Sequence, residues 1–452
     1  MVNLKKPSAN KGLQHQLQAF LADVFFKQKI VNPKLVLAYS GGLDSTVLLH
    51  LLTECYKILP FQLTAHHVHH GLSSNADDWA DFCQKTCATL NVKITLSTVN
   101  INKNSGLGVE ATAREARYTA LFALDADFIC LAHHQDDQAE TLLLQLARGA
   151  GIKGLAGMAA IDLKRKLLRP LLDVPRPLLE DYAKQNQLNW ITDETNVDTA
   201  FDRNFMRHMV LPVLQQQYPS ITQTIRRAAS HMADANDLLD ELAQIDALFA
   251  GFHAQNTTTI SLSALKNLSK TRVNNLIRWW LAQNNLPMPS TQQLLQIAQQ
   301  LLHAKQDAAI ELKVSETLTL RRYQHRAYLV QNMPPNALIN QLWQGEKVVD
   351  LPNNTRLIFS QKMGEGISLR KIENAKLRIK FREGNERFKL HLGRPSQSLK
   401  VILQSVEMPP WQRQQLPLIF MDESLVIIPN IGVDAGLKAA ENEMGLVLEW
   451  QV

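Results

Sequence analysis

An alternation of short apolar runs with helical patterns is the feature that most constrains the fold of this chain. From about residue 34 to 212, the β-rich runs LVLAY, QLTAHHV, VKITLSTV and DFICLA each precede a stretch with helical spacing. Such alternation is typical of βαβ units, which place parallel strands in one sheet with helices on its faces. We therefore predict an α/β fold with a doubly wound, mostly parallel sheet in residues 1–212.

The pattern changes twice beyond this region. Helical spacing dominates from about 213 to 332, as in LLDELAQIDALF and TQQLLQIAQQLL, and QNMPPNAL then marks a linker. Residues 345–452 mix short strands with one helix near SLKVILQSV, which predicts a small α+β domain. A length of 452 residues suits several domains, and we expect three: 1–212, 213–332 and 345–452.

The segment SGGLDS lies at the turn between the predicted strand LVLAY and the predicted helix STVLLHLL. Ligands bind at this carboxyl edge of parallel sheets, and the helix N-terminus offers unpaired N–H donors to an anion. Asp44 would repel a phosphate unless a divalent cation lay between them, so the loop predicts ATP with Mg²⁺. The alternative is an ordinary helix cap. The predicted ATP contacts here are Ser40, Gly41, Gly42, Leu43, Asp44 and Ser45.

A second polar cluster follows the predicted strand FICLA, in the stretch HHQDDQAET. Acidic residues suit the first turn of any helix, but capping alone does not require so many ligand-capable side chains. The cluster comprises His133, His134, Asp136, Asp137 and Glu140.

The run HHVHH could be interpreted as a zinc site, but no cysteine or acidic residue stands at the usual spacing. Alternate strand residues also point to opposite faces. We expect His66, His69 or His70 to line a nucleotide pocket instead, with His66 as the predicted ATP contact.

Two motifs carry a resemblance to known enzymes. SGGLDS resembles the SGGxDS pyrophosphate-binding loop of the N-type ATP pyrophosphatases, the PP-loop superfamily, and lacks the lysine of a Walker A motif. HHQDDQAET resembles the HHxDDQxET element of one family in that group, the tRNA(Ile)-lysidine synthetases. HVHHGL, EATAREARY and DRNFMRHMVLP are also similar to elements of this family, although Ser73 and Phe205 stand where it often has arginine.

The resemblance implies a ligase that adenylates the wobble cytidine in the CAU anticodon of tRNA(Ile) with ATP. The side-chain amine of free L-lysine then replaces AMP, and the lysidine formed changes decoding from AUG to AUA. By the same resemblance, Asp44 is a Mg²⁺ ligand and Arg114 stabilises charge on the phosphates. Asp137 either binds the metal or handles lysine, and the sequence does not separate these roles.

Basic residues concentrate near the C-terminus. The window 370–400 holds ten lysines and arginines against three glutamates, and the whole chain carries a net charge of +6. Within it, KLRIKFR alternates apolar and cationic residues, which predicts a strand with one packed and one cationic face. That face suits RNA, and a solvated edge strand is the alternative. The predicted RNA contacts are Arg203, Arg207, Lys376, Arg378, Lys380 and Arg382, with Arg272, Arg278 and Trp280 as weaker candidates.

The cysteine count and the length of the apolar runs limit the cellular compartment in which we expect the protein. The four cysteines, Cys55, Cys83, Cys87 and Cys130, are too few and too clustered for a disulfide framework. No apolar signal segment and no run of eighteen apolar residues occurs, so we expect a cytoplasmic protein without membrane contact. The sequence does not indicate the oligomeric state, and a homodimer is one of the alternatives.

Three other functions compete with the lysidine interpretation. A tRNA thiolase would need cysteine pairs or an iron–sulfur cluster, whereas Cys83 and Cys87 form only C-x-x-x-C within a helical pattern. An amidating ligase for a free nucleotide or small acid would turn over ATP without tRNA. A non-catalytic tRNA-binding protein would bind nucleotide without releasing pyrophosphate.

Overall fold

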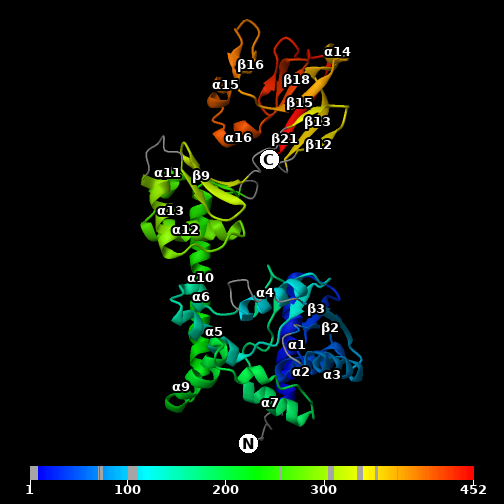
Figure 1. Cartoon of the computed structure of the whole chain (residues 1–452), viewed down its shortest axis with the longest axis vertical. Helices are drawn as coiled ribbons and strands as arrows, with labels where there is room; N and C mark the ends of the chain where they lie inside the picture. The colour runs from blue at the N-terminus through cyan, green and yellow to red at the C-terminus, as the bar shows by residue number, and fades with distance from the viewer. Residues whose placement is uncertain are drawn as a thin grey trace, which may run out of the picture. The chain divides into compact units, whose positions relative to one another are not determined.

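The computed structural model describes residues 9–69, 71, 75–99, 109–253, 257–303, 310–332, 339–351, 355–373 and 375–451. His70 and Ser73 lie outside the described residues. The chain divides into two compact units, Met1–Glu241 and Leu242–Val452 (Figure 1). The three domains expected from the sequence stay a prediction.

A six-stranded sheet with the order β3-β2-β1-β4-β6-β5 forms the centre of the first unit. Its neighbouring strands pair in parallel except β5 and β6, which are antiparallel. The predicted mostly parallel sheet is therefore confirmed. The strands are β1 (Lys34–Ala38), β2 (Gln62–His69), β3 (Lys93–Thr98), β4 (Phe128–Cys130), β5 (Ile161–Asp162) and β6 (Leu167–Leu168).

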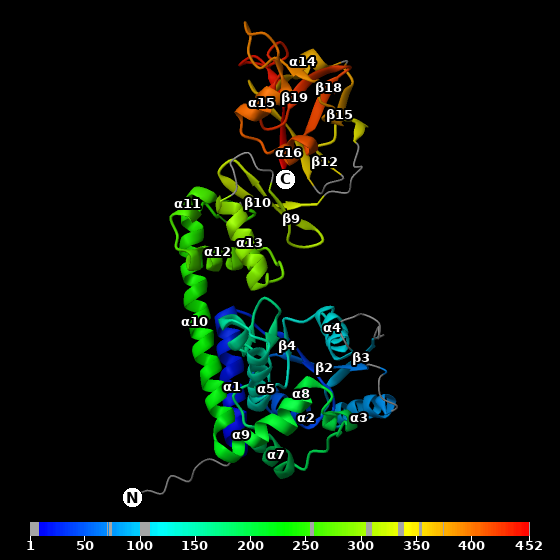
Figure 2. The ribbon, with the colours of Figure 1, turned by 60° about the vertical axis from the view of Figure 1, so that its left-hand side comes forward.

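Helices cover both faces of this sheet, and the central strand β1 presents apolar side chains to each face. In β1, Leu35 and Leu37 pack into one core cluster, while Val36 packs into another together with Leu121 of α4. Figure 2 and Figure 1 both show α4 on the side of the sheet opposite α2 and α3. The helices are α1 (Ala9–Gln28), α2 (Leu43–Tyr56), α3 (Ala76–Thr89), α4 (Val109–Phe122) and α7 (Arg176–Gln185).

The strand order positions a ligand site between β1 and β4. From β1 the chain proceeds outward to β2 and β3, and it then returns to add β4 on the other side of β1. This reversal is a topological switch point, where the loops after the two strands diverge and leave a crevice at their carboxyl ends. SGGLDS follows β1 and HHQDD follows β4, so both predicted motifs border the same crevice.

Further helices complete the first unit around α5 (Gln135–Ala147). Ala139 of α5 shares a small core with Leu211 and Ile225, which anchors the following helices beside the crevice. They are α6 (Ile152–Leu155), the 3₁₀ turn η1 (Glu194–Val197), α8 (Asp202–Phe205), the π-helical turn η2 (Met206–Val210), α9 (Leu211–Gln217) and α10 (Ile221–Phe249), which continues into the second unit.

The second unit begins with the predicted helices and adds a four-stranded antiparallel sheet, β7-β10-β9-β8. The sequence pattern had indicated mostly helix here, because three of these strands lie close to the linker and their partner β7 is only three residues long. The elements are α11 (Leu262–Lys266), α12 (Lys270–Gln283), α13 (Thr291–His303), β7 (Thr259–Ser261), β8 (Glu311–Lys313), β9 (Leu318–Tyr323) and β10 (Arg326–Gln331).

Two of the weaker RNA candidates have structural partners in this region. Trp280 is fully buried, and its indole N–H donates to the Thr257 carbonyl at 2.8 Å. Arg272 forms a two-pronged ion pair with Asp246, which is itself buried. Core packing and charge neutralisation therefore account for both residues.

The C-terminal part has a five-stranded sheet, β11-β15-β18-β19-β20, and a four-stranded sheet, β12-β13-β21-β14, over a shared apolar core. The predicted helix near SLKVILQSV is α15. No helix in the described ranges is long and apolar enough to span a membrane. The elements are β11 (Asn340–Leu342), β12 (Val348–Asp350), β13 (Arg356–Met363), β14 (Ile367–Ser368), α14 (Leu369–Ile372), β15 (Leu377–Phe381), β16 (Arg387–Phe388), β17 (Gln397–Ser398), α15 (Leu399–Ser405), α16 (Pro410–Gln415), β18 (Pro417–Met421), β19 (Ser424–Ile428), β20 (Gly432–Val433) and β21 (Met444–Gln451).

The basic strand β15 lies inside its sheet, between β11 and β18. Its apolar residues are buried, as the alternation predicted. On the cationic face Arg378 donates to Asn340 Oδ1 at 2.9 Å and Lys380 lies 5.5 Å from the Phe420 ring centroid. The alternative of a protective edge strand is therefore wrong, and contact with RNA stays a prediction.

Candidate active site

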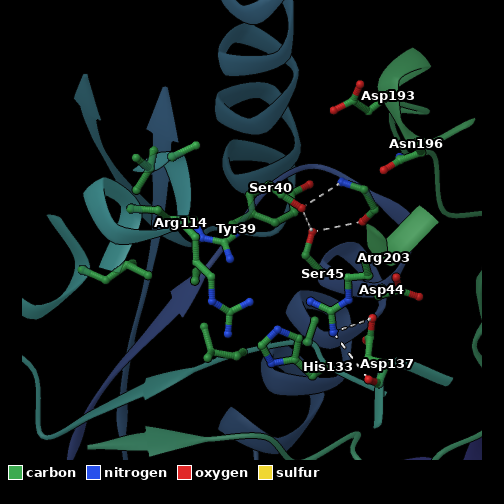
Figure 3. A pocket seen from close by; sticks show the side chains of 18 of the residues that line it. Tyr39, Ser40, Asp44, Ser45, Arg114, His133, Asp137, Asp193, Asn196 and Arg203 are labelled. Atoms are coloured by element: carbon green, nitrogen blue, oxygen red, sulfur yellow. Dashed lines mark hydrogen bonds and ion pairs between the residues drawn. The ribbon is translucent and has the colours of Figure 1, made fainter. Parts of the chain in front are cut away.

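A cavity of about 500 Å³ opens at the switch point of the first unit (Figure 3). Its lining extends from Ala38 to Arg207, which are 169 positions apart in the sequence. Gly41 and Leu43 are not part of its wall, and Leu43 is buried in the core. The predicted site residues that line the cavity are Ser40, Gly42, Asp44, Ser45, His66, Arg114, Asp137, Arg203 and Arg207.

The SGGLDS loop is held in a tight turn over the N-terminus of α2. Gly41 has a φ of +81°, and its carbonyl accepts a hydrogen bond from the Ile191 N–H at 2.9 Å. The Ser45 hydroxyl donates to the Gly42 carbonyl at 3.0 Å and lies 3.1 Å from the Ser40 hydroxyl. The loop is thus fixed before any anion binds, with both hydroxyl groups beside the N-terminus of the helix.

Substituting Gly41 with alanine is expected to destabilise the first unit by about 3 kcal/mol, from a left-handed backbone and a crowded site. An added Cβ would lie 2.7 Å from Ile191 Cδ1 and 3.0 Å from Cys83 Sγ. Gly149 is the matched control, because its φ is +67° and a Cβ there would meet nothing within 4 Å. Urea unfolding should show a loss of about 1 kcal/mol for Gly149→Ala. Equal losses for the two variants would contradict the close approach at Gly41.

Asp44 and Asp137 converge on the imidazole of His134. His134 caps the N-terminus of α5. Its Nδ1 accepts a hydrogen bond from the backbone N–H of Asp136 at 3.2 Å, and its backbone N–H donates to Asp137 Oδ2 at 2.9 Å. Its Nε2 lies 3.6 Å from Asp44 Oδ2 and 3.5 Å from Asp137 Oδ2. Burial alone would lower the pKa of His134, but the two carboxylates outweigh it and raise that pKa.

The two carboxylates differ in what they can still bind. Asp44 Oδ1 is buried and has no hydrogen-bond partner among the described residues. Asp137 uses Oδ2 for the cap and Oδ1 for Arg207 at 3.2 Å. Burial opposes ionisation of Asp137, yet His134 and Arg203 hold its pKa at about 2. An orphaned carboxylate oxygen suits a hard cation, so Asp44 fits the Mg²⁺ role more readily than Asp137.

Arg203 and Arg207 form part of the cavity wall and are held by a buried glutamate. The Glu140 side chain is fully buried and pairs with Arg203 Nε at 2.9 Å and with Arg207 Nε at 2.6 Å. Burial opposes the charge of Arg207, but Glu140 and Asp137 outweigh it and raise its pKa. The sequence had suggested that these arginines hold RNA near the site; the structure places them inside it, and their role stays a prediction.

Helix α4 supplies two cations to the opposite wall, as Figure 3 shows for Arg114. The guanidinium carbons of Arg114 and Arg117 lie 5.3 Å and 5.7 Å from the Tyr118 ring centroid. Arg117 was not predicted as a site residue, although its spacing of three from Arg114 places both on one helical face.

Other wall residues were also missed or differ in detail. Asp193, just before η1, and Asn196, within it, were not predicted as site residues, whereas His133 belongs to the predicted polar cluster and reaches the cavity from the loop after β4. His66 does line the cavity, but its ring nitrogens contact the hydroxyls of Thr95 and Ser97 at 2.7 Å and 2.9 Å. Burial lowers the pKa of His66, so it is a neutral part of the wall.

Comparison with known proteins identifies the family. Three family models match: "PP-loop domain" at residues 10–214, "TilS substrate binding domain" at 260–328 and "TilS substrate C-terminal domain" at 377–450. A tRNA(Ile)-lysidine synthase of Nitrosomonas europaea is 39% identical over 444 residues, which cover 95% of each chain. The chain belongs to the tRNA(Ile)-lysidine synthase family.

Further relatives of that name match equally broadly. The Coxiella burnetii protein is 36% identical and covers 93% of this chain and 94% of its own. The protein of an Azoarcus species is 37% identical and covers 92% of this chain and 91% of its own. Together with the PP-loop domain, these relatives make the chain an ATP-dependent ligase of the tRNA-modifying class, which confirms the enzyme class predicted from the motifs.

Proposed function

We propose that this chain converts the wobble cytidine in the CAU anticodon of tRNA(Ile) to lysidine, with ATP and free L-lysine as co-substrates. The observation that carries the proposal is the single cavity in which the SGGLDS loop meets the HHQDD turn, in a member of the lysidine synthase family. The product would change decoding from AUG to AUA. A homodimer stays a prediction.

In the first step, the oxygen on cytosine C2 attacks the α-phosphorus of ATP, and pyrophosphate leaves. Ser40, Ser45 and the N–H groups at the start of α2 would bind the departing phosphates. Arg114 would stabilise the charge that builds on them from the facing wall. Asp44, with Asp137 as the second predicted ligand, would hold the Mg²⁺ that neutralises charge on the phosphates.

In the second step, the side-chain amine of lysine attacks C2, and AMP leaves with the former cytosine oxygen. Lysine needs an anionic partner that orients its ammonium group before the proton is lost. A pKa of about 2 keeps Asp137 ionised near neutral pH, but makes it a poor proton acceptor there, because effective bases have a pKa near the working pH. We therefore assign Asp137 to orienting lysine, and the proton of its ammonium group passes to solvent water.

The target base must leave its stack to enter the cavity, as in other enzymes that act on bases. Anticodon loops lower that cost because they are partly unstacked, and basic surfaces then hold the rest of the RNA through phosphates. Arg203 and Arg207 would contact the RNA at the cavity. Lys376, Arg378, Lys380 and Arg382 of the second unit would contact the tRNA elsewhere.

Pyrophosphate release from ATP, measured with and without unmodified CAU-anticodon tRNA(Ile), tests the proposal. Release should require the tRNA, and labelled lysine should enter the RNA in a matching amount. Release without tRNA would instead indicate a ligase for a small substrate. Binding of tRNA without any release would indicate a non-catalytic protein.

The cysteines provide a separate test against a thiolase. All four are buried, and burial raises the pKa of Cys55 and Cys87 to about 11 and that of Cys83 and Cys130 to about 12. At pH 8 about one thiol in a thousand at Cys55 and Cys87, and about one in ten thousand at Cys83 and Cys130, would then be the reactive thiolate. We expect no rapid reaction with a disulfide reagent in the native protein and four equivalents in urea. Rapid native reaction of Cys83 or Cys87 would favour sulfur chemistry.

A further inference from the structure

A buried arginine contacts the ring of His133 from behind the cavity wall. Arg169 follows β6 and is 6% exposed. Its Nε donates to His133 Nδ1 at 3.2 Å, and its Nη1 donates to the Ala159 carbonyl at 2.7 Å. No carboxylate in the described ranges forms an ion pair with it. Because this buried guanidinium donates to the imidazole, it restricts which ring nitrogen of His133 can carry the proton.

That contact fixes the tautomer of His133. A guanidinium has no acceptor and is not deprotonated in proteins, so it can only donate. His133 Nδ1 must therefore carry a lone pair, and a neutral ring then carries its proton on Nε2. Within the described part of the chain, Nε2 has no hydrogen-bond partner, and the ring lines the cavity (Figure 3). The geometry thus leaves one N–H donor free at the site.

The surrounding charges also disfavour a second proton on this ring. The charged groups that face His133 are Asp137 on α5, Arg203 on α8, Arg169 after β6 and Arg117 on α4. Three guanidinium groups thus oppose one carboxylate. Burial is the largest influence and, with these arginines, lowers the pKa of His133 to about 3. Its neighbour His134 has the opposite surroundings, because the carboxylates of Asp44 and Asp137 lie 3.6 Å and 3.5 Å from its Nε2.

We propose that Arg169 is a positioning residue that holds His133 as a neutral Nε2–H donor, and that this N–H contacts an anionic oxygen of the nucleotide phosphates. The proposal rests on the function proposed above, because it needs ATP in this cavity. A neutral imidazole can stabilise developing negative charge without exchanging a proton, and its strength as a donor does not vary with pH in the physiological range.

Nitrogen-15 NMR of the histidine rings tests the tautomer without any turnover. The signal of His133 is assigned as the one of the 14 histidines that disappears in His133→Gln. We expect a protonated Nε2 and an unprotonated Nδ1 from pH 8 down to pH 5, and a shift of the Nε2–H signal when ATP is added without tRNA. A proton on Nδ1, titration near pH 6.5, or no response to ATP would each overturn the proposal.

Substitution at Arg169 tests the positioning role. In Arg169→Met the ring loses its obligatory donor, so His133 should populate both tautomers, and its pKa should rise while burial, Arg203 and Arg117 still hold it below the ordinary value. Arg169→Lys keeps a buried group that can only donate, so it should retain the Nε2–H form. An unchanged His133 spectrum in Arg169→Met would contradict the proposal, and the wild-type spectrum decides the tautomer even where a variant fails to fold.

Substitution at His133 separates hydrogen bonding from packing. Glutamine can place its amide N–H near the position of Nε2, whereas the shorter asparagine places its amide near Nδ1. We expect kcat for adenylation to fall less than about 10-fold in His133→Gln and about 100-fold in His133→Asn, with a smaller change in the KM for ATP. Equal losses in both variants would indicate packing only. If the wild-type enzyme forms no lysidine, the proposed function is contradicted, but the tautomer of His133 measured by NMR is unaffected.

Discussion

Replacing Asp44 with asparagine is expected to lower the rate of pyrophosphate release about 1,000-fold, the upper range for losing one preorganised electrostatic group. The carboxylate is the second residue of α2, and its Oδ1 is buried without a partner among the described residues. Such an oxygen contributes little to folding and is suited to a cation. The free energy of unfolding in urea should therefore fall by no more than about 1 kcal/mol, from the weakened contact of Asp44 Oδ2 with His134.

Asp77→Asn is the matched control for Asp44→Asn. Asp77 is also the second residue of a 14-residue helix, α3, but its side chain is almost fully exposed. Its loss should leave pyrophosphate release within about twofold, since isolated surface pairs contribute little. An Asp44→Asn enzyme that keeps most of its activity at saturating Mg²⁺ would contradict the metal role.

The second large effect is expected for Glu140→Ala, which should lower the free energy of unfolding by about 3 kcal/mol or more. Glu140 is buried between Arg203 and Arg207, whose side chains are 22% and 24% exposed. Removing it leaves two partly buried guanidinium groups with Asp137 as the one carboxylate that they then share. Adenylation should fall as well, because both arginines lose the contact that orients them.

Glu180→Ala removes a glutamate of similar helical context and serves as the control. Glu180 on α7 pairs with Arg176 at 3.2 Å, but both side chains are more than a third exposed. Chemical denaturation should show a loss below about 0.5 kcal/mol for this variant. A comparably small loss in Glu140→Ala would mean that Asp137 and solvent together neutralise both arginines without Glu140.

Periodicity and local motifs were sufficient to predict the sheet and the cavity at which the two polar motifs meet. The β1 residues alternate between two cores, and the two polar motifs follow adjacent parallel strands, so their convergence follows from the topology alone. The apolar face of β15 could equally be predicted, because apolar and cationic residues alternate along this strand. In each case the information lies within a few consecutive residues.

Contacts between distant segments could not be predicted in the same way. The hydrogen bond from Ile191 to Gly41, the pairing of Glu140 with Arg207 and the contact of Arg169 with His133 join residues 36 to 150 positions apart. No pattern in the neighbouring sequence indicates which residues these partners are. The interior position of β15 likewise depends on which strands pair with it, and not on its own sequence.

The most direct test of the central claim is the identity of the nucleoside at the wobble position after reaction. Unmodified tRNA(Ile) with a CAU anticodon would be incubated with the enzyme, ATP, Mg²⁺ and isotopically labelled L-lysine, and its nucleosides would be analysed by mass spectrometry. We predict that cytidine at this position is replaced by lysidine carrying the label, with none formed when ATP is omitted. Unchanged cytidine, while pyrophosphate is still released, would contradict the account.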